Sequence, residues 1–195
     1  MKFVIATKNQ HKLIEMQRIL LPMGIEAVID SDIGKTLTEP EENGADFKEN
    51  ALIKAKSACL ICGIPAIADD SGLCVDALNG APGVYSARYA GEHGNTKANN
   101  LKLLEELKDV EYKDRTARFV SAIACVFPDG REFCVEGKCE GFIAFEEKGT
   151  NGFGYDPLFI SELGCFAELS AEEKDKISHR GNAMKIFKEE LKKYL

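Results

Sequence analysis

Apolar residues follow two different spacings along the chain, and the two spacings alternate. Short continuous apolar runs predict buried strands, whereas apolar residues that recur every three or four positions predict one face of a helix. The predicted strands are residues 2–7, 25–30, 65–68, 116–127 and 132–139, and the predicted helices are residues 10–21, 46–62, 96–107 and 182–194. Strands that alternate with helices predict an α/β protein.

Two helices have clear inward faces. In the helix over residues 46–62, one face carries Phe47, Ala51, Ala55, Ala58, Cys59 and Cys62. In the helix over residues 96–107, the pattern predicts that Leu101, Leu104 and Leu107 point inward. A capping box formed by Ser170 and Glu173 predicts the start of a further short helix.

The turn Pro128-Asp129-Gly130 joins the last two predicted strands and is the clearest hairpin signal in the chain. An antiparallel hairpin among α/β units predicts a mixed sheet. The segments 31–44, 79–94 and 149–155 are rich in Gly, Pro or polar residues, and we expect them to be loops.

Size and charge limit the classes of function. The chain has 195 residues, enough for one domain or two small lobes, and a formal net charge of -7. A net negative charge argues against non-specific nucleic-acid binding, which needs clustered Lys and Arg. No apolar stretch approaches the roughly 20 residues that a membrane span requires. We therefore expect a cytoplasmic protein with neither nucleic acid nor membrane as partner.

The seven cysteines do not indicate a metal site or a disulfide framework. Cys59 and Cys62 have the CxxC spacing, but no second CxxC and no spaced His pair accompany them, which argues against zinc. We interpret both as small apolar side chains one turn apart on a helix.

The first segment with chemical potential lies where the first strand gives way to the first helix. A helix N-terminus favours anions, and hydroxyl, amide and ammonium groups beside it suit a polyphosphate. The alternative is that Asn9 only caps the helix and Lys12 is solvated. The candidate phosphate-binding residues are Thr7, Lys8, Asn9, Gln10, His11 and Lys12.

The second segment is the acidic sequence Asp69-Asp70-Ser71-Gly72, which we expect at the end of the short third strand. Adjacent carboxylates are costly unless a cation pairs with them. Mg²⁺ binds one or two protein carboxylates together with waters and phosphates, and the acidic loop from Glu39 to Glu42 offers a further ligand. The alternative is a solvated acid in an Asx-turn.

Two further segments suit a nucleoside. In Gly152-Phe153-Gly154-Tyr155-Asp156, the glycines permit close approach, the rings can stack on a base, and Asp156 can accept hydrogen bonds. The alternative is a tight turn with two core aromatics. Lys174 and the sequence Ser178-His179-Arg180-Gly181 lie near a junction of two helices, where cationic groups either converge on a site or belong to a solvated linker.

Taken together, these segments resemble the inosine triphosphate pyrophosphatase family, also called XTP/dITP diphosphatases. The resemblance covers nearly the whole chain. It rests on six pieces in the family's order: Ala6–Lys12, Phe47–Ala51, Ala68–Leu73, Gly80–Tyr89, Gly152–Pro157 and Ile177–Gly181. One departure is Asp46, which precedes Phe47 where the family more often has Thr.

The resemblance implies an elongated mixed-sheet α/β fold, one pyrophosphatase domain over residues 1–195 with two lobes, and a central substrate cleft. It implies a homodimer and a Mg²⁺ cofactor held by Glu42 and Asp70, although Glu41 and Glu39 stay open as alternatives to Glu42. It also places the proton acceptor at Asp70. The implied substrate contacts are the phosphate-binding residues 7–12, Ser71, Phe153, Gly154, Tyr155, Asp156, Lys174, His179 and Arg180.

The expected reaction converts non-standard purine nucleoside triphosphates (ITP, dITP and XTP) to the monophosphate and pyrophosphate, which cleanses the nucleotide pool. Water attacks the α-phosphorus while Mg²⁺, Lys12 and Lys54 offset the phosphate charge. Since Asp70 cannot easily be both a metal ligand and a strong base, Asp69 is open as a partner in that role. A donor from Arg180 or from backbone N–H groups near His179 would favour a 6-oxo purine over adenine.

Three other functions remain open at this point. One is a pyrophosphatase for pyrimidine or other modified nucleotides, against which the segments 153–156 and 178–181 argue. Another is a nucleotide-binding module without catalysis, against which the retained acids argue. The third is a phosphatase built on a DxD pair, which the adjacent spacing of Asp69 and Asp70 does not fit.

Overall fold

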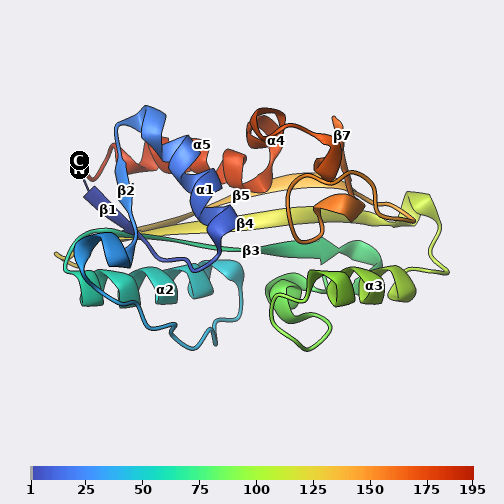
Figure 1. Ribbon diagram of the computed structural model, residues 1–195, viewed down its shortest axis with the longest axis horizontal. Helices are drawn as coiled ribbons and strands as arrows, with labels where there is room; N and C mark the ends of the chain where they lie inside the picture. Colours follow the sequence, from blue (N-terminus) through green and yellow to red (C-terminus); the bar gives the residue numbers. More distant parts are fainter. Residues whose placement is uncertain (1) are drawn as a thin grey trace. The chain divides into compact units, whose positions relative to one another are not determined.

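The computed structural model describes residues 2–195 and contains a seven-stranded mixed sheet flanked by helices (Figure 1). The strand order is β2-β1-β3-β4-β5-β6-β7. Strand β1 pairs in parallel with β2 and β3, whereas β6 pairs antiparallel with β5 and β7. The strands are β1 (Lys2–Ile5), β2 (Glu26–Val28), β3 (Ala66–Val75), β4 (Thr116–Val126), β5 (Glu132–Ile143), β6 (Phe159–Ser161) and β7 (Gly164–Cys165).

Five α-helices accompany the strands: α1 (Gln10–Leu20), α2 (Phe47–Cys62), α3 (Thr96–Glu106), α4 (Ala171–Ile177) and α5 (His179–Leu191). The chain forms two compact units. The first unit holds residues 2–70, 121–137 and 180–195, and the second holds residues 71–120 and 138–179. Strands β3, β4 and β5 contribute residues to both units.

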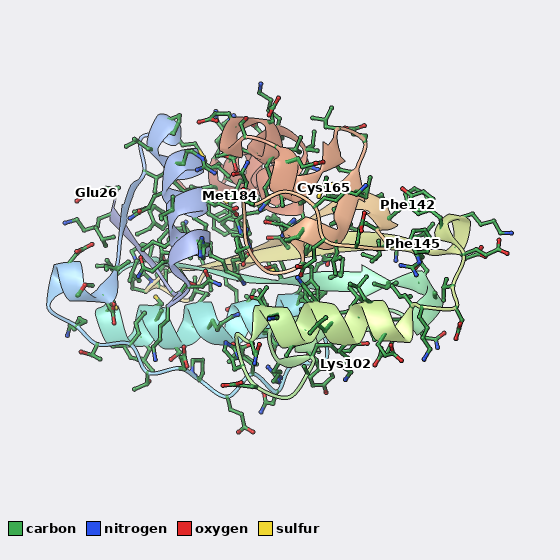
Figure 2. All side chains as sticks on the ribbon, turned by 45° about the vertical axis from the view of Figure 1, so that its right-hand side comes forward. Glu26, Lys102, Phe142, Phe145, Cys165 and Met184 are labelled. Atoms are coloured by element: carbon green, nitrogen blue, oxygen red, sulfur yellow. The ribbon has the colours of Figure 1, made fainter. Side chains whose placement is uncertain are left out.

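In the first unit, α1 and α5 cover one face of the sheet and α2 covers the other (Figure 1). The stripe Leu13, Met16 and Leu20 of α1 packs into a core with apolar residues of β1, β4, β5 and α5. Figure 2 shows the contrast between Met184, which is buried on α5, and Glu26, whose side chain stands exposed at β2. The apolar residues that recur along α1 are therefore the ones that pack it against the sheet.

In the second unit, α3 and α4 lie on opposite faces of the sheet (Figure 1). The core of this unit includes Leu103 and Leu107 from the α3 segment and an aromatic group around Phe119. The ring of Phe119 stacks parallel to that of Phe166, with centroids 5.8 Å apart. Stacked and tilted aromatic pairs of this kind add to the stabilisation that burial provides.

The third strand is longer than the sequence predicted. We expected a strand over residues 65–68 with the acidic pair at its end, but β3 continues through Asp69, Asp70 and Ser71 to Val75. The alternative of a solvated acid in an Asx-turn is also wrong, because both acids are buried within the strand. Small and acidic residues disfavour strands only weakly, and pairing with neighbouring strands overrides that preference.

Two smaller expectations also fail. Leu101 was expected to face the core but is 59% exposed, whereas Leu107 is fully buried as predicted and Leu103, which was not predicted, is also fully buried. The last helix begins at His179 rather than at residue 182, directly after the Ser178 cap of α4. The capping box of Ser170 and Glu173 is confirmed. Within residues 2–195, no helix is both long enough and apolar enough to cross a bilayer.

Candidate active site

Asp69 lies at the centre of a buried ionic cluster in the first unit. The ammonium group of Lys12 lies 2.8 Å from Asp69 Oδ2, and the guanidinium of Arg180 donates to the same oxygen at 3.1 Å. The Ser121 hydroxyl donates to the other carboxylate oxygen at 2.5 Å. Since both oxygens already have partners and the carboxylate is fully buried, Asp69 is a structural anion that fixes two cations.

The charge state of Asp69 follows from these partners. Burial by itself would raise the pKa of the carboxyl, but the charges of Arg180 and Lys12 and the hydrogen bonds from Lys12 and Ser121 hold the pKa well below its ordinary value. Burial also lowers the pKa of Lys12, against the attraction of Asp69. A carboxylate with so low a pKa is a weak proton acceptor, which removes the reason for giving Asp69 a share in base catalysis.

Asp70 points to the opposite face of β3, because successive strand residues alternate. Its Oδ1 accepts a hydrogen bond from Lys54 Nζ of α2 at 2.7 Å. The same ammonium group lies 3.6 Å from Glu42 Oε1. Burial raises the pKa of Asp70, and the nearby Lys54 and Lys12 offset this only in part. The two acids proposed as metal ligands therefore converge on one cation.

The three acids of the loop over residues 39–42 differ in their exposure and in their partners. Glu39 is 71% exposed and lies 3.5 Å from Lys8, away from the Asp70 contact with Lys54. Glu41 is exposed, and Glu42 is the acid of this loop that shares Lys54 with Asp70. The geometry thus favours Glu42 over the two alternatives.

The N-terminus of α1 is capped by Asn9, which Thr7 supports. The Asn9 side chain accepts the backbone N–H groups of His11 and Lys12 at 3.0 and 3.2 Å, and the Thr7 hydroxyl accepts that of Asn9 at 3.1 Å. Lys8 and Gln10 are exposed beside it. Asn9 therefore does cap the helix, and phosphate binding by residues 7–12 stays a prediction.

The departure at Asp46 is explained by its position before α2. Its side chain accepts the backbone N–H of Glu49 at 2.9 Å and so caps the helix. Asp and Thr are both effective N-cap residues. The substitution therefore keeps the function of the position.

Asp156 organises the predicted base-recognition segment, which lies in the second unit. Its Oδ2 accepts the Phe153 backbone N–H at 2.8 Å and the Lys174 ammonium at 2.7 Å. Asp156 and Lys174 are both buried. Asp156 therefore links the loop backbone at Phe153 to Lys174 of α4, and it anchors the loop.

The remaining residues of this group surround the anchor. Lys174 Nζ lies 5.0 Å from the centroid of the Phe153 ring. The Tyr155 hydroxyl donates to the Ser86 carbonyl at 2.8 Å. The His179 ring stacks on Phe119 with centroids 4.7 Å apart. The structure thus brings Lys174 against Phe153 and Asp156, which lie in another segment of the sequence, and packs His179 against Phe119.

Arg180 lies in the first unit, not with this group. Its guanidinium is fully buried and is paired with Glu15 of α1 and with Asp69. The base contact expected of Arg180 stays a prediction. Ser71 follows Asp70 in β3 and is half-buried.

Known proteins match this chain along nearly its full length. The model of the Ham1 family matches residues 3–190. The chain belongs to the Ham1 family. A Ham1 relative from Haemophilus influenzae, a dITP/XTP pyrophosphatase, is 53% identical over 194 residues, which is 97% of this chain and 98% of the relative. The dITP/XTP pyrophosphatase of Exiguobacterium sibiricum is 49% identical, with 100% of this chain and 99% of the relative covered.

Solved Ham1 structures have the same fold. The HAM1 protein from Coxiella burnetii is 40% identical, with a TM-score of 0.87 and 99% of both chains covered. The Staphylococcus aureus Ham1 protein is 39% identical, with a TM-score of 0.85 and 100% of both chains covered. The predicted family and the mixed α/β fold are therefore confirmed.

Sequence reasoning missed two partners in the ionic cluster of this Ham1 chain, Glu15 and Ser121. Ser121 is fully buried within the long apolar run of β4. A lone polar residue in such a run was a usable signal, because buried polar groups need a partner. Glu15 gave no such signal, since a Glu on a helix is ordinarily solvated.

Proposed function

We propose that this chain is a nucleoside-triphosphate pyrophosphatase that converts ITP, dITP and XTP to the monophosphate and pyrophosphate. The observation that carries the proposal is the match, at about half identity and over the full length, to relatives named dITP/XTP pyrophosphatase. The convergence of Glu42 and Asp70 on Lys54 supports it, because hydrolysis of a polyphosphate requires a place for a cation.

Glu42 and Asp70 are the residues that would hold a Mg²⁺ ion. In this structure the Lys54 ammonium stands between them as a cation, so the two carboxylates fit a positive charge. Two protein carboxylates, completed by waters and substrate phosphates, are a typical Mg²⁺ donor set. When bound, Mg²⁺ would offset the charge of the triphosphate and orient it for attack at the α-phosphorus.

Side chains of the protein supply the proton acceptor and further positive charge. Asp70 is the proposed proton acceptor, since Asp69 is committed to Lys12, Arg180 and Ser121. Lys54 would stabilise negative charge on the phosphates, an effect worth about 3 kcal/mol for one well-placed donor.

We propose that the base is recognised by the group around Asp156. Phe153 offers a ring for stacking and Gly154 permits close approach of the backbone, whereas Tyr155 is 5% exposed and supports the loop from the core. Backbone N–H groups near His179 are the proposed donors to a 6-oxo group, since the Arg180 guanidinium is paired with Glu15 and Asp69. Adenine presents an amino group there, and an unmatched buried polar group costs about 1–3 kcal/mol.

The test is pyrophosphate release from ITP, XTP, dUTP and ATP, with Mg²⁺ and with excess chelator. We expect rapid release from ITP and XTP only, and its loss with chelator. The Asp70→Asn variant should abolish turnover while ITP still binds, measured by calorimetry. The control Asp129→Asn removes an acid from the exposed hairpin turn and should keep wild-type activity. Near-normal turnover by Asp70→Asn would refute the assignment of the proton acceptor.

The homodimer and the cytoplasmic location belong to the same proposal and remain predictions. The homodimer is supported by the family resemblance. Sedimentation of the purified chain would measure its oligomeric state directly.

A further inference from the structure

Asn100, on the inner side of α3, contacts the base-recognition loop and had no role in the site predicted from the sequence. Its side-chain Nδ2 donates to Glu147 Oε1 at 2.7 Å and to the Gly154 carbonyl oxygen at 3.3 Å. Asn100 is 1% exposed, whereas Glu147 is exposed on the segment that leads into the loop. All three residues belong to the second unit.

The orientation of the Asn100 amide is fixed by its two acceptors. Turning the amide over would place its oxygen against a carboxylate and a carbonyl, both of which repel it. In the orientation observed, the buried Oδ1 of Asn100 receives no hydrogen bond from any group within residues 2–195. A buried acceptor without a donor costs about 1–3 kcal/mol.

This cost argues against a purely structural role for Asn100. Leucine has a similar branched shape, although a larger volume, and would carry no unmatched oxygen. The amide therefore contributes something that packing does not require, and the only contacts it makes through hydrogen bonds in the described chain are those to Glu147 and Gly154.

The Gly154 peptide is the part of the loop that Asn100 controls. Gly152 and Gly154 both have positive φ, 73° and 63°, so this backbone follows a path that other residues rarely adopt. Asp156 holds the Phe153 N–H on one side of Gly154, and Asn100 holds the Gly154 C=O on the other. The Asp156 contact fixes the peptide plane between Gly152 and Phe153, and the Asn100 contact fixes the plane between Gly154 and Tyr155.

We propose that Asn100, oriented by Glu147, is a positioning residue for purine recognition. It holds the Gly154 carbonyl so that the loop presents the Phe153 ring to the 6-oxo purine in a preformed position. A hydrogen bond to a charged acceptor is stronger than a neutral one, so the Glu147 carboxylate keeps the amide in place. This inference rests on the proposed function, because it concerns the base of the same substrate.

The test separates base binding from phosphate binding. The Asn100→Leu variant keeps the branched shape of the side chain, with a larger volume, and removes its donors. We expect the KM for ITP to rise about tenfold and kcat to stay within twofold of wild type. Inorganic tripolyphosphate has no base, so its inhibition constant should stay within twofold. A role confined to folding would change both constants together or neither.

A second variant keeps the proposal testable if Asn100→Leu does not fold. Glu147→Ala alters an exposed residue and removes the charged acceptor, and we expect a roughly threefold rise in KM for ITP with unchanged tripolyphosphate inhibition. The matched control is Glu146→Gln, which removes the adjacent negative charge and should behave as wild type. Thermal melting of each variant shows whether it is folded.

The outcomes separate a failure of this inference from a failure of the proposed function. If the wild-type chain releases no pyrophosphate from ITP, the proposed function fails. If the wild type is active but folded Asn100→Leu and Glu147→Ala both keep the wild-type KM, or if tripolyphosphate inhibition weakens in parallel, the positioning role is overturned.

Discussion

Replacing Arg180 by Met tests whether the buried ionic cluster holds the first unit together. Arg180 is 1% exposed and pairs with Asp69, which is fully buried, and with Glu15, whose side chain is 12% exposed. Methionine fills most of the same space but removes the charge. The Asp69 carboxylate then loses one cation while it keeps its contacts with Lys12 and Ser121, and Glu15 loses its contact with Arg180.

The magnitude follows from burial. Removing one partner of a buried ion pair typically costs about 3–5 kcal/mol, because the other charge stays in a poorly solvated site. For a protein of this size, about 2–4 °C of Tm is lost for each kcal/mol. We therefore expect Arg180→Met to lower the Tm by roughly 6–20 °C, and a urea titration to give the same loss in the free energy of unfolding.

Two comparisons make this prediction specific. Lys108→Met removes an exposed ion pair with Glu105, whose side chains are 59% and 71% exposed, and should cost about 0–1 kcal/mol. The double variant Arg180→Met with Asp69→Asn removes both charges and should recover part of the loss. If Arg180→Met unfolds within 1 kcal/mol of wild type, the cluster does not stabilise the unit as argued.

Three further results are expected. Asp46→Ala should lower the free energy of unfolding by about 1 kcal/mol, and Asp46→Thr by only a few tenths, because a Thr hydroxyl can cap α2 as well; urea titration measures both. Gly152→Ala should weaken ITP binding, measured as KM, since an added Cβ would lie 2.0 Å from Asp156 Oδ2 at a φ of 73°; an unchanged KM would contradict the role of the loop. Lys54→Met should lower kcat for ITP by about a hundredfold. Lys56→Met is the control on the same helix: it removes an exposed ion pair with Glu132 of β5 and should leave kcat unchanged.

Local patterns were enough to locate most elements. The stripe of Leu13, Met16 and Leu20 predicted α1, and the turn at 128–130 predicted that β4 and β5 are neighbours. Such features are visible in sequence because their cause, periodic burial or a turn residue, lies within a few positions. The six motifs also identified the family, since their order along the chain is itself a sequence property.

The roles of Asp69 and Asp70 were decided by the tertiary structure. In the sequence they are equivalent neighbours, and we expected them together at the end of a short strand, with Asp70 as metal ligand and proton acceptor and Asp69 open as a partner in proton transfer. Strand β3 lies between β1 and β4 and continues through both acids, and alternation then sends Asp69 to Arg180, 111 positions away, and Asp70 to Lys54. Partners so distant in sequence leave no local pattern, so the charge of each carboxylate, and with it the division of labour in the site, exists only once the chain is folded.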